Sequence, residues 1–399
     1  MSLKGIITLL MLFACGFAHS VKAGCVYIGG SGGSTSVKEL KFSLEGRTIS
    51  VPPDVPVGQV IAQKTLTITG WQFDIRCTST ALNFYTLYRN PPKPLADGFS
   101  NIYQTNVPGI GVRYVSSVSG TPGTLPVINS FSPAALGGGY VVSEGGARYT
   151  FNASSVYKVI MEFVKTAPVT ASGVQINPMD LPGAEIRFGY GPGDGSDNLP
   201  IVRFTPSASS LVITTPTCTI EAASANMLVK MGTHHTDDFG GVGTGTAWQD
   251  ASIRLTNCAP FRGIRAASST TSTSQSALTN TNPGVPSSYG VTTDTNNTLD
   301  MNTLELTLSP YEPGTVTQAA NGIFNIDGGA NAASGVAIQL SQTESDAGLI
   351  NLNNKIVKSL PNDSAQSRVI PLYARYIQTD TPITGGVANG RLQYTITYQ

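Results

Sequence analysis

The chain has 399 residues with 24 basic and 24 acidic side chains, and charged residues make up only 12% of it. Balanced charge gives no basic face, so we expect no nucleic-acid partner. Glycine is abundant, at 43 residues, and Ser, Thr and Asn are common, which is typical of an all-β protein with many turns. The length exceeds one ordinary core and predicts two domains.

Residues 1–23 have the pattern of a secretory signal peptide. Lys4 precedes a short apolar run at residues 6–18, and Val-Lys-Ala at residues 21–23 forms a small-x-small cleavage site. The apolar run is too short to span a bilayer. We therefore expect an exported chain whose mature form starts at Gly24.

The cysteines predict two disulfides. Removal of the leader also removes Cys15 and leaves Cys25, Cys77, Cys218 and Cys258. An even number in an exported chain indicates disulfides, and these residues allow three pairings in principle. Because they fall as one pair near the front and one pair in the second half, we expect the local bridges Cys25–Cys77 and Cys218–Cys258, one in each domain.

Strand patterns recur along the chain. Odd positions of residues 71–77 are apolar or Cys and even positions are polar, which points Cys77 and Trp71 into a core. Residues 157–163 repeat the pattern, and so do Ile253 and Leu255. Turn signals separate these runs, as at residues 90–92 and 107–109. Many short strands with turns between them predict sandwiches or barrels.

The domain boundary is predicted just before the third mature cysteine, at residues 214–217. The expected order is a signal peptide at residues 1–23, a first domain at 24–214, a linker at 215–217 and a second domain at 218–399. Residues 266–297 are rich in Ser, Thr and Asn. We expect them to form a long polar loop inside the second domain, too poor in apolar residues to bury anything.

The last residues of the sequence form the clearest strand. Leu392, Tyr394, Ile396 and Tyr398 fall on one side, and polar residues alternate with them. The sequence stops directly after this strand, with no turn and no return strand. Its neighbours must therefore come from earlier in the chain or from another protein, and an unpaired edge is a template for pairing with a different chain.

Catalytic and metal-binding patterns are not evident. His234 and His235 are adjacent, and neighbours on a strand point to opposite faces, so they do not suit one metal ion. They are the only histidines after the predicted leader, so a Ser-His-Asp triad could use only this pair. The Gly-rich residues 189–198 look like a calcium loop but lack its spaced acidic ligands. We expect no cofactor, no metal and no enzymatic activity.

The second half combines several distinctive segments: Cys218-Thr219-Ile220, then residues 253–258, 335–340, 371–376 and 388–390, and the terminal strand. Together they resemble the pilin domain of chaperone–usher fimbrial subunits over about residues 217–399. The resemblance implies an immunoglobulin-like sandwich that lacks its final strand, with a groove beside the C-terminal strand. The implied groove residues are Leu392, Tyr394, Ile396, Tyr398 and Gln399.

The resemblance also implies partners. A periplasmic fimbrial chaperone lends a strand to the groove, and an outer-membrane usher assembles the fibre. In the fibre, the N-terminal strand of the next pilus subunit replaces the chaperone strand. Each exchange completes the same sheet from another chain, because a sheet edge accepts any extended segment of suitable pattern.

The first half resembles the receptor-binding domain of two-domain tip adhesins. It has its own cysteine pair, and residues 101–113 and 162–166 look like segments of fimbrial adhesin domains. The resemblance implies a jelly-roll or immunoglobulin-like lectin domain that binds a host glycan, in a protein carried through the periplasm to the fimbrial tip at the cell surface. The alternative is a structural capping or adaptor subunit whose first domain binds a protein receptor.

Candidate sugar-binding residues combine loop amides and carboxylates with aromatic side chains. The loop at residues 78–82 lacks the Asn-Asp-Tyr run of mannose-binding adhesins, so we do not expect mannose specificity. The candidates are Asn83, Tyr85, Arg89, Asn90, Asp97, Asn101, Tyr103, Asp194, Asp197 and Asn198.

Overall fold

The computed structural model describes most of the chain after the predicted signal peptide. The described residues are 24–28, 37–42, 44, 46–69, 71–77, 82–118, 121–125, 127–131, 140–143, 146–153, 157–189, 199–207, 210–265, 290–293, 299–311 and 316–399. The predicted signal peptide lies outside them, as do residues 190–198.

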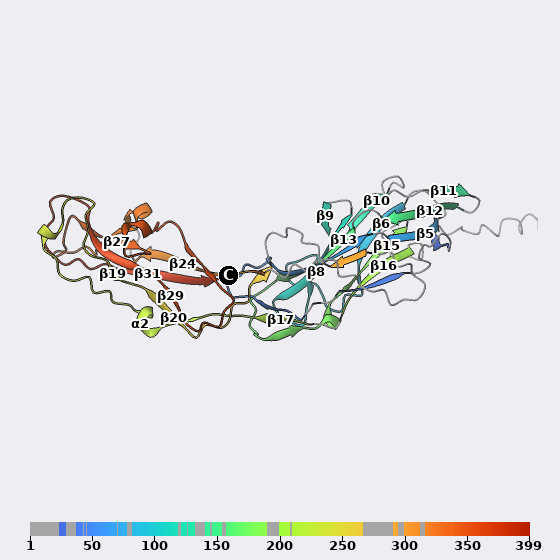
Figure 1. The fold of residues 1–399 in the computed structure, drawn as a ribbon, viewed down its shortest axis with the longest axis horizontal. Helices are drawn as coiled ribbons and strands as arrows, with labels where there is room; N and C mark the ends of the chain where they lie inside the picture. The colour runs from blue at the N-terminus through green and yellow to red at the C-terminus, as the bar shows by residue number, and fades with distance from the viewer. Residues whose placement is uncertain are drawn as a thin grey trace, which may run out of the picture.

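The molecule is elongated and built almost wholly from strands, with two halves placed end to end (Figure 1). The first half is residues 24–214 and the second is residues 218–399. The C-terminus lies at the narrow junction between them (Figure 1). This arrangement confirms the predicted all-β fold in two domains.

The strands of the first half form several sheets. The first sheet has the spatial order β1 (Cys25–Tyr27), β5 (Trp71–Cys77), β12 (Gly146–Ala153) and β11 (Tyr140–Ser143), and the second has the order β10 (Val127–Phe131), β6 (Leu82–Arg89), β15 (Gly183–Gly189), β16 (Leu199–Pro206) and β2 (Lys38–Phe42). The third sheet runs β4 (Val60–Thr69), β13 (Tyr157–Lys165), β8 (Ile110–Val118) and β7 (Tyr103–Gln104), with β9 (Thr121–Thr124) beside β8. The fourth sheet is β14 (Val174–Ile176), β17 (Leu211–Thr214) and β3 (Thr48–Ser50). A short helix, η2 (Pro178–Asp180), follows β14.

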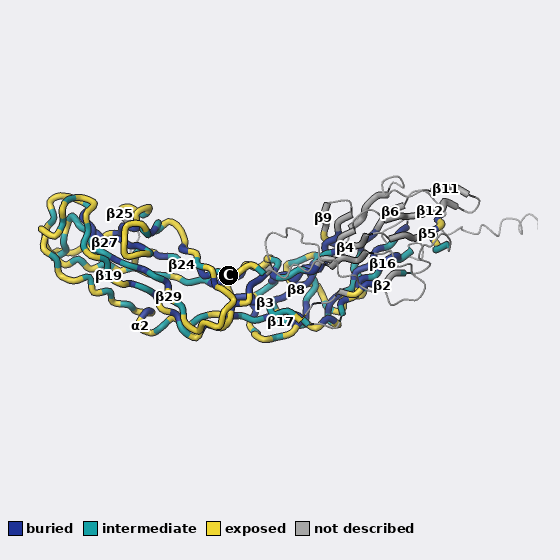
Figure 2. Tube along the Cα trace, in the orientation of Figure 1, coloured by how far each residue is buried: buried dark blue, intermediate teal, exposed yellow. Residues whose placement is uncertain are grey.

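Alternation along the strands builds the core of the first half. Val159, Met161 and Phe163 of β13 are buried, as the period-two pattern predicts. Cys77 at the end of β5 is also buried and forms the predicted disulfide with Cys25. Figure 2 shows buried stretches running along the inside of both halves.

The second half has its own sheets. One sheet is β18 (Thr219–Ile220), β20 (Ile253–Thr256) and β29 (Arg368–Ile370), and a second is β19 (Gln249–Asp250), β30 (Tyr373–Gln378), β27 (Val336–Ser341), β26 (Ile323–Asn325) and β25 (Val316–Gln318). A two-stranded sheet joins β21 (Ile264–Arg265) and β23 (Leu299–Asp300). The last sheet is β28 (Ile356–Leu360), β24 (Asn302–Pro310) and β31 (Leu392–Tyr398). Its helices are single turns: α2 (Ala222–Ala225), η3 (Thr236–Asp238), η4 (Ala319–Asn321) and η5 (Asp346–Gly348).

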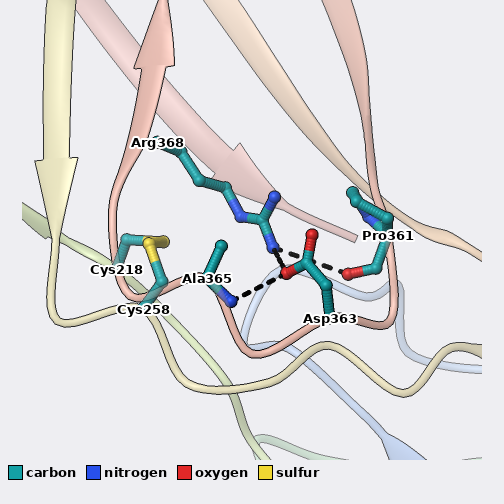
Figure 3. The surroundings of a disulfide bond; sticks show 6 residues. All are labelled: Cys218, Cys258, Pro361, Asp363, Ala365 and Arg368. Carbon is teal, nitrogen blue, oxygen red and sulfur yellow. Dashed lines mark hydrogen bonds and ion pairs between the residues drawn. A yellow bond between two sulfur atoms is a disulfide. The ribbon is translucent and has the colours of Figure 1, made fainter.

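The predicted Cys218–Cys258 disulfide is present and ties the start of the second half to the end of β20. Figure 3 shows it beside a loop that Arg368 and Asp363 close, with Arg368 Nη2 at 2.6 Å from the carboxylate. Hydrogen bonds from the Ala365 amide and from Arg368 lower the pKa of Asp363. The Cys258 amide donates to the carbonyl of Gln366 in the same loop.

The prediction that residues 266–297 form a polar loop throughout is wrong in part, because β22 (Gly290–Thr293) is a strand within them. It pairs antiparallel with β4 of the first half, with Gly290 opposite Thr69 and Thr293 opposite Leu66. Backbone pairing needs no apolar side chains, so composition did not reveal it. A segment of the second half thereby extends a sheet of the first.

Candidate functional site

Strand β31 has one paired and one open edge among the described residues. It pairs with β24, and the amides and carbonyls of Gln399 and Thr303 exchange both hydrogen bonds, at 2.7 and 2.8 Å. In an antiparallel ladder such pairs alternate along the strand. Odd-numbered residues of β31 therefore point their backbone groups at β24. The backbone groups of Leu392, Tyr394 and Ile396 point away from it, to the open edge.

The side chains of the same residues face the core, as their period predicts. Tyr398 is 7% exposed, and Leu392, Tyr394 and Ile396 are partly buried and pack against the core of the second half. The Tyr398 ring stacks on Phe261 with centroids 5.9 Å apart. The open edge is therefore lined by apolar side chains that are only partly covered.

A second segment packs against the same core as β31. Tyr394 Oη donates to the carbonyl of Ser224 at 2.8 Å, which places the segment after α2 beside β31. Residues 227–233 form no helix and take part in no sheet of the described chain. Met227, Val229 and Met231 alternate along this segment and pack against the same core. The open edge of β31 and the apolar side chains that line it are called the groove below; this combination of backbone groups and apolar lining suits an added strand.

The end of the groove meets the first half. Asp54 lies in the loop between β3 and β4, and its Oδ2 accepts a hydrogen bond from the Tyr398 amide at 2.8 Å. Ser50 of β3 is buried beside it and accepts from the Arg262 amide at 2.7 Å. Sequence reasoning did not find this contact, because the local pattern around Asp54 gives no sign of a partner in the other half.

The candidate sugar-binding residues of β6 lie at two opposite ends of the strand. Thr86 Oγ1 lies 3.4 Å from Ser116 Oγ, and Tyr88 Oη lies 3.1 Å from the Tyr114 amide nitrogen. β6 therefore runs toward the start of β8, where Ile110 pairs with Lys165 near the junction. Six residues of extended chain span roughly 20 Å. The candidates therefore do not form one pocket.

The group near the junction surrounds the loop after β6. Asn90 and Asp97 are exposed, and Arg89, Asn101 and Tyr103 are partly exposed. The Tyr103 ring meets Tyr88 edge to face at 4.6 Å, and Tyr88 Oη donates to the Asn101 carbonyl at 2.9 Å. Phe99 of the same loop packs against a small buried cluster that includes Val164 of β13. The loop is held in shape, and it presents polar side chains beside an aromatic ring.

The group at the far end is less complete. Asn83 lies there, paired in register with Gly189, and residues 190–198 follow that glycine. Asp194, Asp197 and Asn198 lie outside the described residues. Tyr85 is 1% exposed, which rules out contact between its side chain and a receptor at the surface of this structure. We therefore remove Tyr85 from the candidates.

A charge cluster that sequence reasoning missed lies on β15 and β16. The Glu185 side chain is buried and accepts from Arg203 Nε at 2.7 Å and from Arg187 Nε. Arg89 Nε lies 4.0 Å from the same carboxylate, and Arg203 also reaches Glu39 at 3.2 Å. Cross-strand neighbours at period two bring these charges together. Arg89 is thereby partly engaged within the fold.

Within the described ranges, no group of three or more His, Cys, Asp or Glu side chains could hold a metal ion. No helix in those ranges is long and apolar enough to cross a membrane.

Comparison with known proteins gives matches in both halves. Residues 43–179 match the family of MrkD-like receptor binding domains, and residues 208–399 match the family of fimbrial proteins. A fimbria adhesin protein of Klebsiella pneumoniae is 26% identical over 370 residues, which cover 92% of each chain. The two halves of the chain therefore match, in turn, a MrkD-like receptor-binding domain and a fimbrial pilin domain.

Two solved structures are similar to this chain. The CupB6 tip adhesin of Pseudomonas aeruginosa is 14% identical with a TM-score of 0.33, covering 94% of each chain. The receptor binding domain of the plasmid-born adhesin MrkD1P of Klebsiella pneumoniae is 20% identical with a TM-score of 0.32, covering 50% of this chain and 99% of that one. Below, the first half is called the receptor-binding domain and the second half the pilin domain.

Proposed function

We propose that this protein is the tip adhesin of a chaperone–usher fimbria and that it attaches bacteria to a host surface by binding a glycan. The observation that supports assembly is the open edge of β31, where apolar side chains lie beside backbone groups that have no strand partner among the described residues. An added strand satisfies both, because it pairs with the backbone and covers the side chains. The function is binding rather than catalysis.

In this proposal the groove has two occupants in turn. A periplasmic chaperone first lends a strand, and after passage through the outer-membrane usher the N-terminal strand of the next pilus subunit takes its place. Covering each half-exposed apolar side chain of β31 contributes part of the roughly 1.5–3 kcal/mol of full burial. The pilin domain is therefore expected to be folded but much less stable alone than in complex.

Assembly is tested by co-expression of the full chain with its chaperone in the periplasm. We expect the two proteins to purify together as a one-to-one complex. Full-length protein that does not bind the chaperone and gains no stability from it would contradict the assembly part of the proposal.

For the receptor site we propose the loop at residues 90–103. It joins the exposed Asn90 and Asp97 to the half-covered ring of Tyr103, and sugars are bound by this combination of hydrogen-bonding groups and an aromatic face. Asn83, at the other end of β6, belongs to a separate candidate surface.

A glycan array with matched variants tests the receptor site. We expect Asn90→Ala and Asp97→Ala to reduce glycan binding about tenfold or more, and Asn83→Ala to leave it unchanged. The opposite pattern would move the site to the far end. An array with no glycan bound, together with capture of a protein receptor, would favour the capping or adaptor subunit instead.

A further inference from the structure

The open edge of β31 does not run the full length of the strand. By the alternation of the ladder, the Tyr398 amide points to the open edge, like those of Leu392, Tyr394 and Ile396. It already has an acceptor, because Asp54 of the receptor-binding domain lies 2.8 Å away. The receptor-binding domain thus occupies the position on the groove that is nearest the junction.

The loop that holds Asp54 is built into the receptor-binding domain. Val51 and Val55 on either side are 0% and 2% exposed. The Lys165 ammonium is buried beneath the loop and donates to the carbonyl of Pro53 at 2.6 Å. Burial lowers the pKa of Lys165, and the nearby carboxylate of Asp54 partly offsets this effect. Asp54 is therefore positioned by packing and by a buried cation.

A buried polar network fixes the same loop to the pilin domain. The Ser50 amide donates to the Gly263 carbonyl at 2.9 Å, and the Gly263 amide donates to Asn302 Oδ1 at 2.9 Å. Asn302 Nδ2 in turn donates to the Ser50 carbonyl at 3.3 Å. Ser50 and Asn302 are 0% and 1% exposed. Buried hydrogen bonds of this kind are costly to break, so the contact between the domains is specific.

We propose that Asp54 is a stop at the junction end of the strand-accepting groove, which sets how far an added strand can pair along β31. This inference rests on the proposed strand complementation. A strand that ends opposite Ile396 leaves the Asp54–Tyr398 contact intact. A strand that continues past Tyr398 needs the same amide and displaces Asp54.

The competition links groove and domain junction. Because binding free energies are reciprocal, any strand that displaces Asp54 also weakens the junction, and a firmly closed junction weakens the binding of that strand by the same factor. A short strand is outside this competition. Asp54 thereby favours partner strands that end opposite Ile396 over longer strands that continue past Tyr398.

The test uses the full mature chain and two synthetic strands of alternating Val and Thr. The short probe is just long enough to pair with residues 392–396, and the long probe has two further residues at each end. Competition between labelled and unlabelled probes gives the ratio of long-probe to short-probe affinity. The variants are Asp54→Ala, Asp54→Asn and the control Asp237→Ala, an exposed carboxylate in η3.

We expect Asp54→Ala to raise the long-to-short affinity ratio about tenfold, since a charged acceptor no longer competes for the amide. Asp54→Asn should raise it by a smaller factor, because the amide oxygen still accepts a hydrogen bond. Asp237→Ala should leave the ratio within about twofold of wild type, well below a loss of one hydrogen bond. With the short probe bound, the Tyr398 amide should exchange with deuterium at least about tenfold faster in Asp54→Ala than in wild type.

An unchanged ratio in Asp54→Ala, with both probes binding, would overturn the role of Asp54 and leave strand complementation standing. A Tyr398 amide that exchanges freely in the wild-type complex with the short probe would also overturn it. If neither probe binds the wild-type chain, strand complementation fails, and this inference falls with it.

Discussion

At the scale of single residues, the junction depends on a glycine. Gly263 has φ +89°, and a Cβ there would lie 2.5 Å from the Asp300 carbonyl oxygen and 2.9 Å from Leu299 Cβ. Its amide and carbonyl both belong to the buried network with Asn302 and Ser50. Any side chain at residue 263 must therefore push β23, which holds Leu299 and Asp300, away from its neighbour β21.

Gly263→Ala should lower the free energy of unfolding of the pilin domain by about 3 kcal/mol. Gly243→Ala is a matched control, because Gly243 has φ +91° and a Cβ added there would meet nothing within 4 Å. It should cost only the backbone strain, about 1 kcal/mol. Denaturant unfolding of the strand-complemented chain measures both, and equal losses would contradict the packing argument.

Buried tyrosines make the receptor-binding domain sensitive to alkali. Burial raises the pKa of Tyr88 to about 12, and burial also raises the pKa of Tyr114. In the unfolded chain a tyrosine ionises near pH 10. Between these pH values the folded state holds the proton and the unfolded state does not. Stability should therefore be fully present below pH 10 and fall as pH rises toward 12.

Tyr88 alone should account for about 3 kcal/mol of that loss. Tyr88→Phe should be less stable at neutral pH, because the Tyr114 amide loses its acceptor. Its stability should then fall less steeply than that of wild type between pH 10 and 12. Denaturant unfolding at several pH values measures the slopes, and parallel curves for the two proteins would refute the assignment.

At the scale of elements, β31 combines a paired edge, an open edge and an apolar face. Replacing Tyr394 and Ile396 together by Ser should weaken strand capture by about 3 kcal/mol, because two core-facing anchors are lost. Thr395→Ser, on the opposite face of the same strand, is the control and should change little. Titration with the short probe measures both affinities, and equal affinities for the two variants would contradict the groove geometry.

The pairing of β22 with β4 is a second element that joins the domains. Thr292→Pro removes a backbone donor from β22 and should disrupt it. We expect those amides in residues 66–69 that point to β22 to exchange at least about tenfold faster, while residues 158–163 on the β13 side of the sheet stay protected. Unchanged exchange in residues 66–69 would show that the two strands do not pair in solution.

The sequence predicted what depends on local pattern. Period two located β5, β13 and β31, and the clustering of cysteines gave both disulfides. The pairing of β22 was missed because its partner lies in the other half and the signal is carried by backbone groups alone. Asp54 was missed because its partner, Tyr398, also lies in the other half, and the local pattern around Asp54 gives no sign of it. Tyr85 was misplaced because alternation on β6 does not tell which face of that strand is covered.

At the scale of the whole molecule, the chain is an elongated adhesin whose two domains meet where β31 ends (Figure 1). The loop at residues 90–103 and the groove lie on different domains. Receptor binding and assembly are therefore separate tasks, connected at the Asp54–Tyr398 contact. Variants of the loop should leave strand capture unchanged, and variants of β31 should leave glycan binding unchanged.

The central claim is that β31 offers an open edge to a strand from another chain. Hydrogen–deuterium exchange of the Leu392, Tyr394 and Ile396 amides, with and without the short probe, tests it most directly. We predict rapid exchange in the free chain and at least about a hundredfold slower exchange in the complex, while amides of residues 393 and 395 stay protected by β24 in both. Amides of all five residues that are equally protected without any added strand would contradict the account.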